Sequence, residues 1–202
     1  MTAPRAALFV VDTGPLITLA AAESLDYLLY PNVPIIIPDA LFYEATRDSA
    51  KLGAQSIIDW VKLHHERIEI AVTNTYVNFD AARSVNPRAY EPNLRERASV
   101  EVIEEPGPLQ GDEKAVLLCE GTAVTRRIVV RERERIIELS TMDYLKLLEA
   151  EQRIQSADAV FDRALAAGGA PSRVEKFGEH DPALREAVRD TLRAAQRDRK
   201  TR

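Results

Sequence analysis

The stretch from Ala7 to Ile17 constrains the fold more tightly than any other part of the chain. It begins with a short run of apolar and β-branched residues, typical of a buried strand, which Gly14-Pro15 ends. Proline suits the first turn of a helix, and Thr13 or Gly14 can cap that helix. Asp12 is therefore predicted at the carboxyl end of a core strand, facing a helix, where ligands bind in open α/β sheets. An aspartate in this place can also act only as a helix cap.

The rest of the chain continues the alternation of strands and helices. Further strands are predicted at residues 33–37, 68–72, 114–120 and 135–139. Helices are predicted at residues 16–30, through 41–45, at 50–66, 93–105 and 122–134, after Ser140-Thr141, and at 155–167, with 73–92 as a loop containing at most one helix. This alternation favours an α/β fold in which a parallel sheet is sandwiched between helices.

The length of the chain suits one domain with an appendage. It has 202 residues, of which 46% are hydrophobic, enough for a substantial core. We expect a first domain at residues 1–170 and a charged helical extension at 171–202. In that extension Leu184, Val188 and Leu192 form a seam that is too narrow for a core, so the helix is predicted to dock elsewhere.

Composition excludes several classes of protein. A single cysteine, Cys119, rules out an internal disulfide and a cysteine zinc site, and it fits a reducing cytosol. The apolar run before Asp12 is too short for a signal-peptide core, and no apolar run approaches the ~18 residues of a membrane span. We therefore expect a soluble, cytoplasmic protein with no membrane partner. The net charge of -5 argues against a strongly basic nucleic-acid protein, although a carboxylate-lined site would itself make the total acidic.

Four acidic residues occupy equivalent places in this predicted fold. Asp12 and Glu120 end apolar strands, whereas Glu44 and Glu96 lie in early turns of helices. Parallel strands would bring all four to one edge of the sheet, where their charges would repel and raise one another's pKa values. Such a site requires a divalent cation, and oxygen ligands favour Mg²⁺ or Mn²⁺. A metal of this kind activates water and stabilises charge on a phosphodiester.

Some of these acids have plainer interpretations. Glu44 can be an ordinary surface residue, and Glu96 can complete a capping box with Asn93. At 100° per residue, however, Glu96 falls between Val100 and Ile103 on the inward side of its helix, which favours a ligand.

A second assignment of helices and strands, here called the second register, gives a different third acid. In it residues 111–114 open a helix and Asp112 replaces Glu96. The next apolar run, 128–130, would then end in Arg131 instead of an acid. We prefer the first register, with Asp112 as the second choice.

Several of these segments resemble the motifs of PIN-domain nucleases. Val10–Ile17 resembles the first motif of that family, and Ile37–Thr46 resembles the second. Glu96-Arg97-Ala98 is similar to the third motif, whose pattern is Gly-Glu-x-Ala. Leu117–Glu120 falls where the fourth strand of the family ends in an acid. The leucine-rich helix after Ser140-Thr141 also resembles a late segment of the family, so the resemblance covers residues 7–170. Two positions depart from it: Arg95 stands where glycine is usual, and Glu120-Gly121 replaces an aspartate that a second acid often follows.

The resemblance implies a Mg²⁺/Mn²⁺-dependent endoribonuclease, often the VapC-like toxin of a bacterial toxin–antitoxin pair. Its catalytic metal ligands would be Asp12, Glu44, Glu96 and Glu120. Such toxins form homodimers and are silenced by an antitoxin whose peptide covers the acidic groove. We therefore expect an RNA substrate, a cognate antitoxin and a homodimer, with the last helix packed on one of these two proteins. Because Glu120 is one methylene longer than aspartate, the alternative is a catalytically weak PIN-like module that acts by binding protein or RNA.

Arginines after Glu120 are candidates for contacts with RNA phosphates. They are Arg126, Arg127, Arg131, Arg133 and Arg135. The interleaved Glu132 and Glu134 are equally consistent with a solvated helix face.

Overall fold

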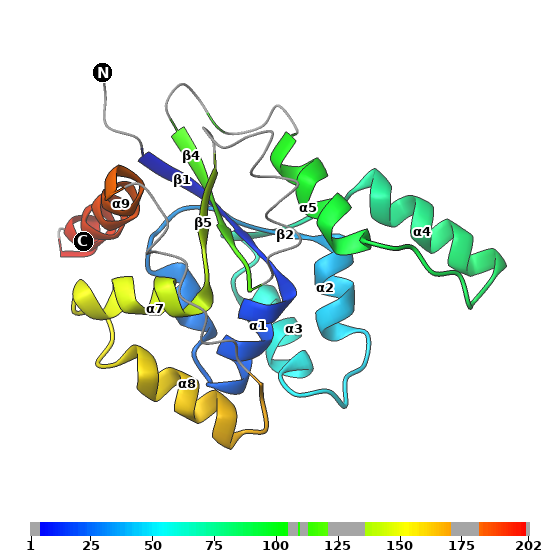
Figure 1. Cartoon of the computed structure of the whole chain (residues 1–202), viewed down its shortest axis with the longest axis horizontal. Helices are drawn as coiled ribbons and strands as arrows, with labels where there is room; N and C mark the ends of the chain where they lie inside the picture. Colours follow the sequence, from blue (N-terminus) through cyan, green and yellow to red (C-terminus); the bar gives the residue numbers. More distant parts are fainter. Residues whose placement is uncertain (1–4, 105–108, 110–112, 121–135, 171–181, 201–202) are drawn as a thin grey trace.

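A computed structural model describes residues 5–104, 109, 113–120, 136–170 and 182–200, and its centre is a five-stranded sheet (Figure 1). The strands are β1 (Arg5–Val11), β2 (Ile35–Pro38), β3 (Ile68–Ala71), β4 (Glu113–Leu118) and β5 (Ile136–Leu139). Their order is β3-β2-β1-β4-β5, and each neighbouring pair is parallel. The predicted α/β class with a parallel sheet is confirmed, and all strands end at one edge.

Helices cover both faces of this sheet. They are α1 (Thr13–Ala21), the 3-10 helix η1 (Leu25–Leu29), α2 (Asp39–Thr46), α3 (Ala54–Leu63), α4 (Asn74–Val85), α5 (Leu94–Glu104), α7 (Thr141–Ala150), α8 (Ala157–Ala166) and α9 (Pro182–Lys200). Alternate residues of β1 point to opposite faces. Phe9 and Val11 enter the larger core with α1, α2, α3, α7 and α8, whereas Leu8 and Val10 enter a smaller one beneath α5.

The helix predicted at residues 16–30 is two elements, so this prediction was wrong. α1 ends at Ala21, and Glu23 takes a left-handed backbone conformation with φ of 53°. That conformation cannot continue an α-helix, and the chain resumes as η1 after Ser24, whose backbone N–H donates to the carbonyl of Leu19 at 2.8 Å.

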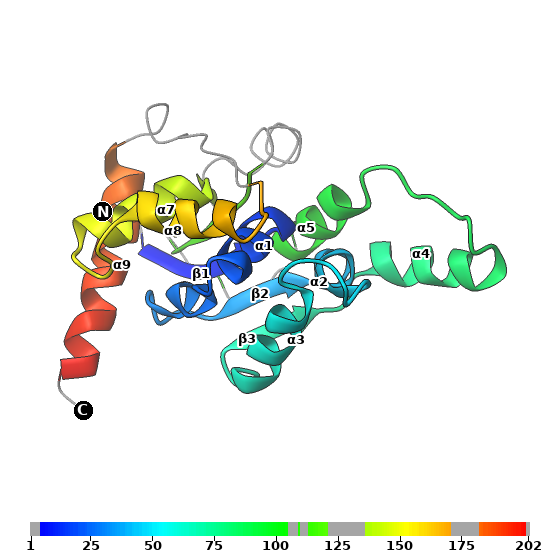
Figure 2. The same ribbon diagram turned by 90° about the horizontal axis from the view of Figure 1, so that it is seen from below.

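Residues 73–92, predicted mainly as loop, contain the three-turn helix α4. Thr73 caps it by accepting a hydrogen bond from the backbone N–H of Tyr76 at 3.1 Å. Figures 1 and 2 show α4 extending from one side of the molecule, beyond α2 and α5. The sequence pattern is weak here because α4 buries little: Thr75 is its one buried residue.

The region around β4 decides between the two registers. Glu113 and Lys114 are the first residues of β4, so the prediction that residues 111–114 open a helix is wrong. Asp112 itself lies outside the described residues. So do the predicted helix at 122–134 and the arginines proposed to contact RNA.

Val188 and Leu192 in the seam of the last helix belong to the main core, which corrects the prediction that the seam is too narrow for one; the side chain of Leu184 lies outside the described residues. Val188 and Leu192 are fully buried in the larger cluster, and the small residue Ala187 widens the seam. Thr191 Oγ1 donates to the carbonyl of Ala6 in β1 at 3.1 Å. α9 therefore packs on the central strand of its own chain. The domain boundary after residue 170 stays a prediction.

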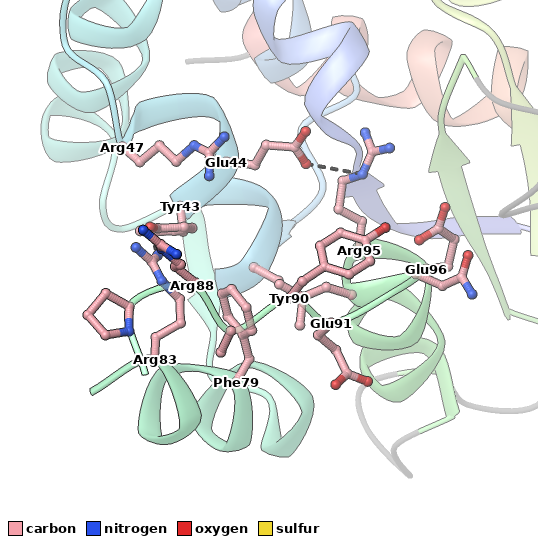
Figure 3. Close-up of a pocket in the computed structure, with 15 residues that line it drawn as sticks. Tyr43, Glu44, Arg47, Phe79, Arg83, Arg88, Tyr90, Glu91, Arg95 and Glu96 are labelled. Carbon is pink, nitrogen blue, oxygen red and sulfur yellow. Dashed lines mark hydrogen bonds and ion pairs between the residues drawn. The ribbon is translucent and has the colours of Figure 1, made fainter. Parts of the chain in front are cut away.

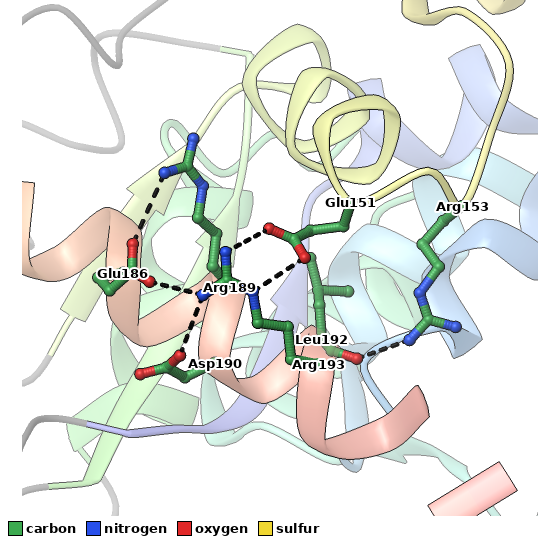
Figure 4. Close-up of polar contacts among 7 residues, drawn as sticks. All are labelled: Glu151, Arg153, Glu186, Arg189, Asp190, Leu192 and Arg193. Atoms are coloured by element: carbon green, nitrogen blue, oxygen red, sulfur yellow. Dashed lines mark hydrogen bonds and ion pairs between the residues drawn. The ribbon is translucent and has the colours of Figure 1, made fainter. Parts of the chain in front are cut away.

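Polar contacts also join α9 to the residues that follow α7 (Figure 4). Arg193 donates to both carboxylate oxygens of Glu151, each at 3.0 Å, and Arg153 donates to the carbonyl of Leu192 at 2.6 Å. Burial of apolar side chains and hydrogen bonds thus both hold α9 in place.

In the described ranges, no helix is long and apolar enough to cross a membrane.

Truncation of Leu192 tests this packing. Because the side chain is fully buried, Leu192→Ala should lower the free energy of unfolding by about 2–5 kcal/mol. The exposed neighbour Ala194 provides a control, since Ala194→Ser should change it by less than about 0.5 kcal/mol. Urea denaturation at low protein concentration measures both. Equal stability of Leu192→Ala and the wild type would show that α9 does not pack on β1 in solution.

Candidate active site

Asp12 lies at the carboxyl end of the central strand, as predicted. Its backbone N–H donates to the carbonyl of Leu118 at 2.9 Å, which ties it to the end of β4. Its Oδ1 accepts a hydrogen bond from the backbone N–H of Thr13 at 2.7 Å, so it also caps α1. The side chain is only 7% exposed. An aspartate needed only as a cap does not require such burial, because exposed caps serve equally well.

The environment of Asp12 disfavours its negative charge. Burial raises the pKa of Asp12 most, while the hydrogen bond from Thr13 and the charge of Arg95 oppose this effect. The charges of Glu44 and Glu96 raise the pKa further. Glu44 and Glu96 therefore lie close enough to act on Asp12, and the fold brings together three of the four predicted acids with one arginine.

Glu44 pairs with Arg95 across the gap between α2 and α5. Arg95 Nε lies 3.1 Å from Glu44 Oε2, and Figure 3 shows the arginine reaching from α5 toward the glutamate. Both side chains are partly exposed, at 43% for Arg95 and 39% for Glu44. Arg95, noted in the sequence only as a departure from a glycine, thus supplies a counter-charge inside the acidic site.

Glu96 lies in the first turn of α5, beside Arg95. The preceding Asn93 has a left-handed backbone with φ of 56°, whereas the first residue of a capping box is extended. The interpretation of Glu96 as a partner in a capping box therefore lacks the backbone geometry that it needs. Glu96 lines the same cleft as Glu44.

Glu120 lies two residues after β4 and close to Gly14, in the turn that follows Asp12. Its carboxylate accepts a hydrogen bond from the hydroxyl of Thr141, the first residue of α7. Its aliphatic stem lies against Gly14, where an added Cβ would come within 2.7 Å of Glu120 Cγ. A side chain at position 14 would force Glu120 to shift, so the glycine lets Glu120 lie beside the turn that carries Asp12.

The ligand chemistry of the four acids fits a hard divalent cation, because every donor is a carboxylate oxygen. A cation would also relieve the repulsion that Glu44 and Glu96 exert on Asp12. In the described ranges, no three or more His, Cys, Asp or Glu side chains are arranged as a group that could hold a metal ion. One of the four carboxylates, that of Glu44, is engaged by Arg95.

A cleft of about 570 Å³ adjoins the acids, and its cations and rings were missed by the sequence analysis (Figure 3). Besides Glu44, Glu96 and Arg95, it is lined by Tyr43, Arg47, Phe79, Arg83, Arg88 and Tyr90. The guanidinium carbon of Arg83 lies 5.4 Å from the ring centre of Tyr43 and 5.6 Å from that of Phe79. Tyr90 is 83% exposed. The spacing of Tyr43 and Arg47, and of Phe79 and Arg83, by four residues is the signal that could have revealed this cleft.

No protein-family model, curated protein or solved structure matches this chain. The resemblance to PIN-domain nucleases therefore stays a prediction from the sequence motifs.

The raised pKa of Asp12 predicts how a neutral replacement changes stability with pH. A raised folded-state pKa means that the ionised side chain destabilises the fold, so the stability that protonation supplies is lost as pH rises through that pKa. Asp12→Asn removes the charge and keeps an oxygen for capping. It should be more stable than the wild type at pH 7, and the difference should shrink as pH falls from the raised pKa toward the ordinary aspartate value, below which it should be lost.

Urea denaturation at several pH values measures this difference. Asp59→Asn, at an exposed position of α3, is the matched control and should show no such gain at pH 7. A loss of stability in Asp12→Asn at pH 7 would contradict the electrostatic account and leave capping as the dominant role.

Proposed function

We propose that this chain is a Mg²⁺- or Mn²⁺-dependent endoribonuclease of the PIN type, which hydrolyses phosphodiester bonds in RNA. The observation that carries the proposal is the buried Asp12 at the carboxyl end of β1, with the charges of Glu44 and Glu96 acting on it. A carboxylate destabilised by burial and by like charges is typical of a functional site, because a purely structural role would not need that arrangement.

In this proposal the four acids bind the metal. Asp12, Glu44, Glu96 and Glu120 would be the ligands, with Thr141 and Gly14 holding Glu120 in place. When bound, the metal would activate water and stabilise negative charge on the phosphodiester.

The adjoining cleft supports a nucleic acid as the substrate. Arginines can neutralise phosphates, and exposed rings such as Tyr90 can stack on unpaired bases. The acids Glu44 and Glu96 line the same cleft, so a chain bound there would pass beside the carboxylates. A net charge of -5 does not oppose this, because the positive charge is local.

The resemblance to VapC-like toxins supports a more specific role. In that role the protein would be a cytoplasmic homodimer that cleaves RNA and is held inactive by a cognate antitoxin. The antitoxin would cover the acidic groove that Glu44 and Glu96 line.

A catalytically weak PIN-like module that binds RNA or protein is the second candidate. The ion pair between Arg95 and Glu44 favours it, because the chain itself supplies a counter-charge to the acids.

Cleavage and metal binding distinguish the two candidates. A structured RNA with single-stranded loops is incubated with Mn²⁺ and wild-type protein, Asp12→Asn, Glu120→Gln or the control Asp59→Asn. For the nuclease, Asp12→Asn and Glu120→Gln should lower the cleavage rate by about 100-fold or more, since even residues behind metal ligands change activity by about 10–100-fold. Calorimetry should show Mn²⁺ binding to the wild type and not to Asp12→Asn. RNA binding by a wild type that neither cleaves nor binds Mn²⁺ would instead establish the binding module.

Binding of RNA to the cleft is tested in the Asp12→Asn background, where cleavage does not interfere. Tyr90→Ala should weaken the binding of a short single-stranded RNA by about 1–3 kcal/mol if a base stacks there. Arg88→Gln should reduce the slope of log affinity against log salt by about 0.7 for one lost phosphate contact. Fluorescence anisotropy measures both effects.

The controls are Lys62→Gln and Leu63→Ala at exposed positions of α3. Each removes a side chain comparable in charge or apolar area from outside the cleft. Equal losses in the controls and the cleft variants would place the RNA elsewhere on the protein.

A further inference from the structure

Arg95 occupies an unusual position for a basic residue in an acidic site. Its Nε lies 3.1 Å from Glu44 Oε2, and the next residue in α5 is Glu96. Its positive charge lowers the pKa of Asp12, which Glu44 and Glu96 raise. One guanidinium therefore acts on the same carboxylates that would surround a metal ion.

We infer that Arg95 and a divalent cation compete for the carboxylate of Glu44, so that Arg95 sets the affinity of the site for metal. This inference rests on the proposed function, because Glu44 must be a metal ligand. A carboxylate oxygen bound to a doubly charged cation would place that cation next to the guanidinium of Arg95, and the two positive charges would repel. Metal binding at Oε2 therefore requires the ion pair to open.

The surroundings of the pair allow it to open. Both side chains are partly exposed, so water screens the attraction and little free energy holds them together. Arg95 also lines the cleft of about 570 Å³, which gives the released guanidinium space. Arg95 is in this respect a positioning residue, because it acts through Glu44. It sets the cation concentration at which the acids bind a metal ion.

Calorimetric titration of Mn²⁺ without RNA tests the inference directly. Arg95→Gln should lower the Kd for Mn²⁺ about fivefold, which converts to about 1 kcal/mol, the upper end for exposed ion pairs. Arg88→Gln is the matched control, because it removes an equal charge from an exposed residue of the same cleft. That control should leave the Kd within about twofold, since its charge is screened by water.

A double-mutant cycle separates competition at Glu44 from a general effect of charge. Glu44→Gln should weaken Mn²⁺ binding by removing a ligand. In that background Arg95→Gln should change the Kd no more than Arg88→Gln does, because the contested carboxylate is absent. Melting curves by circular dichroism verify that each variant is folded, and Arg95→Ala gives a second test of the same loss of charge.

Two results would overturn the inference in different ways. Mn²⁺ binding by the wild type that Arg95→Gln leaves unchanged, or weakens, would remove the competition while the proposed metal site stands. No Mn²⁺ binding by the wild type or by either Arg95 variant would remove the metal site itself, and the inference with it.

Discussion

β1 is paired in parallel with β2 on one side and β4 on the other, and the candidate site depends on this arrangement. Parallel pairing sends the chain after each strand to the same edge of the sheet. Asp12 directly follows β1 at this edge. Glu44 lies in α2, which follows β2, and Glu120 comes shortly after β4. A one-residue slip of β1 would reverse its inward and outward residues, so the core packing that fixes its register also fixes Asp12.

The acids gathered at this edge raise an electrostatic problem that the fold itself partly solves. Asp12 is buried where the charges of Glu44 and Glu96 oppose its ionisation, and Arg95 offsets them. Because the ion pair with Glu44 is partly exposed, this compensation is weak. The same arginine also borders the cleft lined with rings and guanidinium groups, so the acidic and basic parts of the site meet at one residue.

Strands and their ends were predictable because short buried runs carry a strong local pattern. The break at Glu23 was not, since a left-handed residue other than glycine has no clear sequence signal. α4 was underestimated because it buries little. The prediction for α9 considered only the width of its apolar seam. In the structure, the small residue Ala187 and the hydrogen bond from Thr191 to Ala6 allow α9 to pack against β1. The cleft was not predicted, because its lining residues come from four separate segments of the chain. These are α2, α4, α5 and the residues between α4 and α5.

By itself, the sequence determined the class of fold and the edge of the sheet at which Asp12, Glu44, Glu96 and Glu120 lie. Strand ends and helix starts are local properties, set by apolar runs, proline and glycine. Only the tertiary structure decided which side chains meet there: Arg95 with Glu44, Glu120 with Thr141 and Gly14, and Arg83 with Tyr43. These contacts join residues far apart in the chain, and their partners depend on how the helices pack over the sheet, which no local pattern encodes.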